Sequence, residues 1–142
     1  MSSDLEEVLE EYHRALDGVV KGDPSPQERL WSRRDDVTLA NPLGPPARGW
    51  AEVLDALHRA VSQLSDGEVL AFERISGYSN DDLAYILEIE RSRLKMGGAP
   101  EPVPVSLRVT TIFRREEDGW KVVHRHADPI TEPRPVESIV QG

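Results

Sequence analysis

The 142-residue chain has no cysteine, no long apolar run and fewer basic than acidic residues. Without cysteine it forms no disulfide, uses no thiolate nucleophile and builds no cysteine-based zinc or iron–sulfur site. No apolar stretch approaches the roughly 20 residues that a membrane-spanning helix needs. The segment from Met1 to Glu7 is acidic and has no apolar signal core, so we expect a cytoplasmic protein that does not contact membranes.

Positive charge is scarce. The chain has 17 lysines and arginines but 26 aspartates and glutamates, which gives a net charge of −9. Nucleic-acid phosphates bind clustered basic side chains, and the basic residues here are scattered among acidic ones. Nucleic acid is therefore not an expected partner. The 38% of apolar residues are enough to build the core of one soluble domain.

The first half of the sequence predicts three helices. Apolar residues recur at three- and four-residue steps between residues 3 and 20, as on one face of an amphipathic helix. Ser25 and Pro26 have the positions of an N-cap and a first helical residue, so a short helix is expected to run to about residue 32. A third apolar face between residues 50 and 64 predicts another helix.

The second half predicts strands at residues 69–78, 83–94, 105–115 and 120–128, with a short additional strand at the edge, residues 37–40. Helices followed by strands indicate an α+β fold in which three N-terminal helices pack on a curved antiparallel sheet. We expect residues 1–130 to form the domain. Residues 131–142 are rich in proline and are expected to form an extended or disordered tail.

Alternation along the two long strands predicts which side chains face the helices. On residues 83–94 the predicted inward set is Tyr85, Leu87, Ile89 and Arg91. On residues 105–115 it is Val105, Leu107, Val109, Thr111 and Phe113.

Three short segments carry a family resemblance: Trp31 with the step Asp35 to Val37, Gly49-Trp50, and above all Asp118-Gly-Trp-Lys-Val-Val-His-Arg-His126. Together they resemble the cone-shaped NTF2-like fold, in its SnoaL-like or ketosteroid-isomerase-like branch, over roughly residues 4 to 130. The last segment also resembles the final strand of the association domain of calcium/calmodulin-dependent kinase. The resemblance implies a pocket at the open end of the cone and a convex sheet face that pairs with a second subunit.

The last strand allows two orientations. Apolarity favours Trp120 and Val122 facing inward, which would bring His124 and His126 with them. Aligning this strand with the last strand of the proteins it resembles favours the opposite orientation, with Val123, Arg125 and Ala127 facing inward. This second interpretation is preferred.

Two residues are candidate proton acceptors. His126 lies in a His-x-His pair, and neutral imidazole can act as a general base near pH 7. Metal ligation by the pair is disfavoured against a structural or interface role because no third histidine is obviously placed to join it. Asp36 could reach the pocket mouth if an apolar surround raised its pKa, although a surface pair with Arg33 or Arg34 is the simpler interpretation.

Hydrogen-bond donors and anion-binding groups complete the candidate site. Tyr12 or Tyr85 could supply a hydroxyl donor, and Arg91 or Arg125 could hold a carboxylate bidentately, with Thr111 nearby. An arginine paired with a glutamate is the competing interpretation. Trp31 and Trp50 are expected in the core, where they could also wall an apolar cavity.

These observations leave three functions open. The first is cofactor-free and metal-free acid/base chemistry on a small, partly apolar organic molecule, such as isomerisation, cyclisation or dehydration. The second is binding of such a molecule without turnover. The third is a module that only assembles into a homodimer, because this fold carries all three roles.

Overall fold

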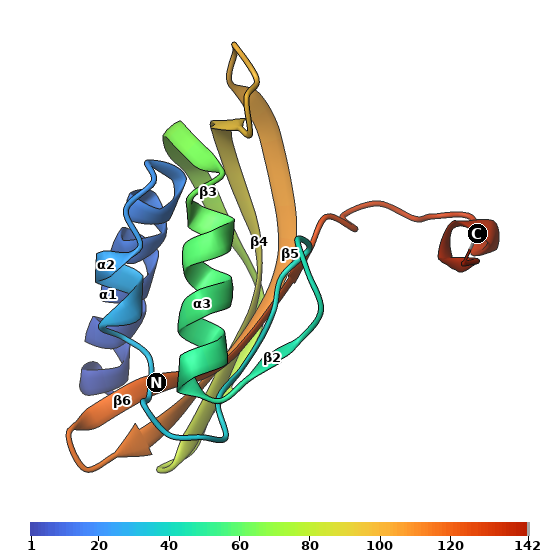
Figure 1. The fold of residues 1–142 in the computed structure, drawn as a ribbon. Coiled ribbons are helices and arrows are strands. Elements are labelled where there is room, and N and C mark those ends of the chain that lie inside the picture. The colour runs from blue at the N-terminus through green and yellow to red at the C-terminus, as the bar shows by residue number, and fades with distance from the viewer. Residues whose placement is uncertain (142) are drawn as a thin grey trace.

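Three helices lie on one side of a curved sheet in the computed structural model, which describes residues 1–141 (Figure 1). They are α1 (Ser3–Val20), α2 (Ser25–Glu28) and α3 (Trp50–Val61). The predicted α+β class, with N-terminal helices packed on a curved and mainly antiparallel sheet, is confirmed. Within residues 1–141, no helix is both long and apolar enough to cross a membrane.

The sheet has six strands in the order β2-β1-β6-β5-β4-β3. The strands are β1 (Thr38–Ala40), β2 (Ala47–Arg48), β3 (Leu64–Ser79), β4 (Leu83–Met96), β5 (Val103–Glu116) and β6 (Gly119–Asp128). β1 runs parallel to β6 and does not form the edge as predicted, because the chain turns back and adds β2 outside it. After β6 the chain leads away from the sheet to a single 3-10 turn, Val136–Ile139 (Figure 1).

The bounds of α1 agree with the predicted ones, whereas α2 ends earlier than predicted. The apolar face of α1 buries Leu5, Leu9 and Leu16 against the sheet. α2 ends at Glu28 because the next residues bond to β6 instead of continuing the helix. The Val122 amide donates to the Leu30 carbonyl at 2.8 Å, and the Ser32 amide donates to the Val122 carbonyl at 3.0 Å.

Strand β4 presents the opposite face from the predicted one. Its buried side chains are Ala84, Ile86, Glu88, Glu90 and Leu94, while Tyr85 is exposed and Leu87 only half-buried. The prediction that Tyr85, Leu87 and Arg91 face the helices is therefore wrong. Both faces of β4 carry apolar residues, and the two glutamates can be buried because basic side chains pair with them. On β5 the prediction is confirmed, since Val109, Thr111 and Phe113 are buried.

Strand β6 combines the two predicted orientations. Val122 pairs with Phe113 and His124 pairs with Ile112, which leaves Val123 as an extra residue in the ladder. Such a β-bulge shifts the alternation by one position. Trp120 and Val122 before the bulge, and Arg125 and Ala127 after it, are consequently all buried on the helix side.

Gly67 of β3 lies where the end of α1 contacts β3 and β4. A Cβ atom at this position would lie 2.7 Å from the Val20 Cβ and 2.8 Å from the Leu94 Cβ, and closer still to the Val20 carbonyl oxygen. Only glycine lets these backbones approach so closely.

We expect Gly67→Ala to lower the free energy of unfolding by about 1–3 kcal/mol, the range for overpacking in a tight interior. Gly98→Ala is the matched control, because a Cβ there meets nothing within 4 Å. Urea unfolding followed by circular dichroism measures both. Equal stability of the two variants would contradict the tight contact.

Candidate functional site

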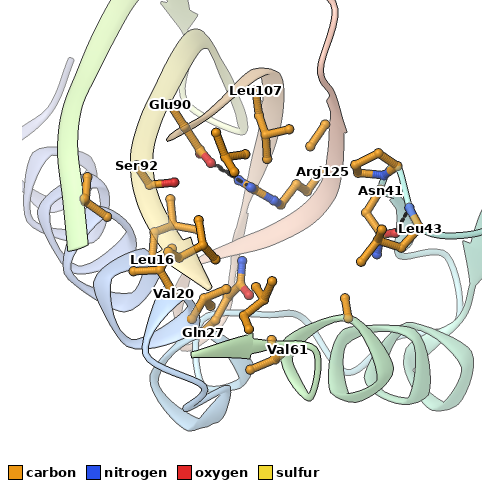
Figure 2. Close-up of a pocket in the computed structure, with 18 of the residues that line it drawn as sticks. Leu16, Val20, Gln27, Asn41, Leu43, Val61, Glu90, Ser92, Leu107 and Arg125 are labelled. Atoms are coloured by element: carbon orange, nitrogen blue, oxygen red, sulfur yellow. Dashed lines mark hydrogen bonds and ion pairs between the residues drawn. The ribbon is translucent and has the colours of Figure 1, made fainter. Parts of the chain in front are cut away.

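A cavity of about 130 Å³ lies between the helices and the concave face of the sheet (Figure 2). Most of its wall is aliphatic, from α1, α3 and the long strands. The lining includes Leu16, Val19, Val20, Leu39, Leu57, Ala60, Val61, Leu94, Val105 and Leu107, with Asn41, Pro42 and Leu43 of the β1–β2 connection on one side. An apolar wall of this kind favours hydrocarbon ligands over water.

Two charged side chains of the wall, Glu90 of β4 and Arg125 of β6, form a buried bidentate ion pair. Arg125 Nη1 and Nη2 donate to the two carboxylate oxygens of Glu90, each at 2.8 Å. Burial alone lowers the pKa of Arg125, but the Glu90 charge, Tyr12 and the hydrogen bonds to both together outweigh burial and raise the pKa, so the guanidinium stays charged. The pair therefore contributes no net charge to the cavity.

Tyr12 of α1 joins this pair to β5. Arg125 Nη1 donates to the Tyr12 hydroxyl at 2.5 Å, and the hydroxyl lies 2.6 Å from Thr111 Oγ1. Since a guanidinium cannot accept, the proton of Tyr12 is directed to Thr111. Burial raises the pKa of Tyr12 to about 12, so its phenol is neutral at pH 7.

Gln27 of α2 is a further polar residue in the cavity wall. Its side chain is almost fully buried, and its Oε1 has no hydrogen-bond partner among residues 1–141. Sequence reasoning assigned no role to Gln27, because glutamine in a short helix is usually a surface residue. It also missed Glu90, because it assigned β4 the wrong inward face.

A second polar cluster lies outside the cavity and connects α1 to the sheet through hydrogen bonds. His13 Nε2 lies 2.7 Å from one oxygen of Glu88, and Arg74 Nε donates to the other at 2.8 Å. Burial raises the pKa of Glu88, but these hydrogen bonds outweigh it and hold the pKa below the usual value. The His13 ring stacks on Phe72, with 4.0 Å between the ring centroids.

Three of the predicted site residues come together as one hydrogen-bonded group: Tyr12, Thr111 and Arg125. Tyr85 and Arg91 do not join them. Arg91 belongs to the residues that line the cavity, but its guanidinium donates to Glu73 at 2.6 and 3.0 Å on the convex face.

The predicted proton acceptors lie away from the cavity. His126 is exposed on the convex face, 3.4 Å from Asp128. Asp36 is an exposed residue whose partner is Arg114 and not Arg33 or Arg34, with distances of 2.7 and 3.1 Å. Hydrogen bonding from Arg114 lowers the pKa of Asp36, which is opposite to the shift that a general base needs.

The two tryptophans that were predicted to line the cavity also lie away from it. Trp31 is buried in the core, as expected, where it bridges to Val122 of β6. Trp50 is partly buried at the start of α3, with the Arg33 guanidinium 3.9 Å from its ring centroid. Neither belongs to the cavity lining.

The family model described as the SnoaL-like domain matches residues 5–131. The chain belongs to this family. The resemblance noted in the sequence is thereby confirmed, and the cavity and its ion pair are features of a SnoaL-like domain. A comparison with curated proteins finds no match.

Several solved structures share the fold of this SnoaL-like domain. A proposed dehydratase of the NTF2-like family from Streptomyces avermitilis has a TM-score of 0.76 and 22% identity, over 92% of this chain and 98% of that one. A ketosteroid isomerase-like protein from Erwinia carotovora atroseptica has a TM-score of 0.72 and 17% identity, over 89% and 94%. An NTF2-like superfamily protein from Salmonella enterica serovar Typhimurium has a TM-score of 0.76 and 16% identity, over 95% and 96%. At such identities the likeness shows the fold alone.

We expect Arg125→Met to lower the free energy of unfolding by about 3–5 kcal/mol, because it leaves the Glu90 carboxylate buried without its partner. Arg91→Met is the matched control, since it removes an equally bidentate arginine from an exposed glutamate. It should change stability very little. Denaturant unfolding at pH 7 compares the two, and equal losses would contradict the central role of the buried pair.

Proposed function

We propose that the chain binds a small, uncharged and mainly apolar organic molecule in the cavity between the helices and the sheet. The observation that carries this proposal is an aliphatic wall whose buried charged groups, Glu90 and Arg125, neutralise each other. A charged ligand would lose its hydration there and meet no unpaired opposite charge. A neutral ligand loses little hydration and gains contact with the leucine and valine side chains.

The size of the cavity limits the ligand. An apolar cavity of about 150 Å³ can hold benzene. The cavity of about 130 Å³ is therefore suited to a ligand of about benzene's size, such as a single small ring. Arg125 donates three hydrogen bonds to Glu90 and Tyr12. Because a guanidinium has five N–H groups, it retains donor capacity for an oxygen atom of the ligand.

Binding without turnover agrees better with this site than acid/base catalysis. His126 and Asp36 lie away from the cavity, and Glu90, the carboxylate in its wall, is held on both oxygens by Arg125. An isomerase, cyclase or dehydratase acting here would have to use Glu90 as its base. Arg125 opposes that role, because both carboxylate oxygens already accept hydrogen bonds from its guanidinium.

Ligand binding is tested with four probes that have equal numbers of non-hydrogen atoms: toluene, phenol, pentanoate and N-methylpyridinium. We expect the two neutral probes to shift the methyl NMR signals of Leu57, Val61 and Leu94, and to bind at least about tenfold more tightly than the two ions. Ala60→Phe should abolish these shifts by filling the cavity. Ala51→Phe, on the exposed face of α3, should leave them unchanged. Failure of both neutral probes, or insensitivity to Ala60→Phe, would refute the proposal.

We further propose that the convex face of the sheet joins two copies of the chain. The strand register aligns Tyr78, Tyr85, Ile112 and His124 in one row across this face, and both tyrosines are exposed. Further along the same face, Arg91 is paired with Glu73 and Arg108 with Asp128. Two such faces could therefore meet without strong charge repulsion, although the whole chain carries a charge of −9.

Dimerisation is measured by light scattering after size-exclusion chromatography. We expect the native chain to be a dimer and Tyr85→Glu to be a monomer, because the new carboxylates would be buried next to apolar groups. Leu70→Glu is the control, since Leu70 is exposed in a shallow depression on the α1 side of the sheet. A monomeric native chain would rule the dimer out.

A further inference from the structure

The side-chain amide of Gln27 is buried at the cavity and lacks a complete set of hydrogen bonds. Gln27 is only 2% exposed and belongs to the cavity lining. Its Oε1 has no hydrogen-bond partner among residues 1–141. Figure 2 shows the amide directed into the space beside Val20 and Val61, on the opposite side of the cavity from Arg125 and Glu90. Buried polar side-chain atoms nearly always have a partner, so this one is unusual.

The segment that carries Gln27 is held in place on both sides. The Glu28 amide donates to the Pro24 carbonyl at 3.0 Å, within the turn of α2. Immediately afterwards, Leu30 and Ser32 exchange backbone hydrogen bonds with Val122 of β6. These bonds restrict the backbone on which Gln27 sits. An amide fixed in this way can select a ligand group by position, because little ordering remains to be done on binding.

We propose that Gln27 recognises a hydroxyl group of the ligand, so that the ligand class is small neutral alcohols and phenols. This inference rests on the proposed binding function of the same cavity. Oε1 is an acceptor and needs a donor, which a hydroxyl supplies and a hydrocarbon, ether or ketone does not. A half-turn of the amide about its Cγ–Cδ bond exchanges Oε1 with Nε2, and a hydroxyl can serve either atom because it both donates and accepts.

The rest of the cavity then orients the ligand. With the hydroxyl at Gln27, the hydrocarbon part extends past Leu16 toward the ion pair on the far side. Carboxylates are excluded because Arg125 is already neutralised by Glu90. The site therefore distinguishes ligands by one hydrogen bond. A ligand that cannot form this bond leaves a buried polar atom unpaired and binds much more weakly.

The experiment compares phenol with toluene, which have equal numbers of non-hydrogen atoms and differ by hydroxyl against methyl. Dissociation constants come from NMR titration of the cavity methyl groups. We expect the native chain to bind phenol at least about tenfold more tightly than toluene. In Gln27→Leu this preference should disappear, because leucine offers no acceptor and adds apolar contact. Gln63→Leu is the matched control, since Gln63 is exposed, and it should keep the preference.

Two results would overturn the role of Gln27 while leaving the binding function intact. One is equal binding of phenol and toluene by the native chain, a measurement that needs no variant. The other is a preference for phenol that persists in Gln27→Leu or, should that variant not fold, in Gln27→Met. If neither probe binds and Ala60→Phe has no effect, the binding function itself is refuted together with this inference.

Discussion

The buried pair of Arg125 and Glu90 is the interaction on which the interior of this domain depends. It places two full charges beside an aliphatic cavity, which is possible only because each satisfies the other and Tyr12 takes a further hydrogen bond from Arg125. Through Tyr12 and Thr111 the pair links α1, β4, β5 and β6. A single electrostatic arrangement thus connects the first helix, three central strands and the wall of the cavity.

This arrangement also determines what the cavity can accept. The charges cancel locally, so ligands are selected by shape, by contact with hydrocarbon and by single hydrogen bonds. Arg91 and Arg108 on the convex face are likewise paired with carboxylates, although those pairs are in water and contribute little to stability. Similar ion pairs therefore have different consequences on the two faces of one sheet, because solvent screens one set and is excluded from the other.

The sequence predicts the elements of this fold better than it predicts the faces of its strands. Helices α1 and α3 have strong periodic patterns, and their positions were predictable from them. On β4, both sets of alternating residues include apolar side chains, and the buried set contains two glutamates. Periodicity alone places such glutamates in solvent, since their partners His13 and Arg125 are distant in sequence.

The same limit applies to the candidate site. Tyr12, Thr111 and Arg125 could be proposed from residue type and strand position, and the structure brings them together. Gln27 could not, because its burial results from the bonds that hold α2 against β6. His126 and Asp36 had suitable chemistry in the sequence, but His126 lies on the outward side of β6 and Asp36 in a turn, and both are exposed to solvent. Residue type predicts possible chemistry, whereas burial depends on contacts that sequence spacing does not show.

The bulge at Val123 makes the length of β6 unusually important for this chain. Trp120 and Arg125 are an odd number of residues apart and yet share one side of the sheet, which only the extra residue permits. A one-residue deletion between them would turn the guanidinium to the solvent and leave Glu90 alone among leucines and valines. The β4–β5 connection near Gly98 has open space around it and carries no such restriction. During divergence, insertions and deletions should therefore accumulate in that connection and be eliminated from the last strand.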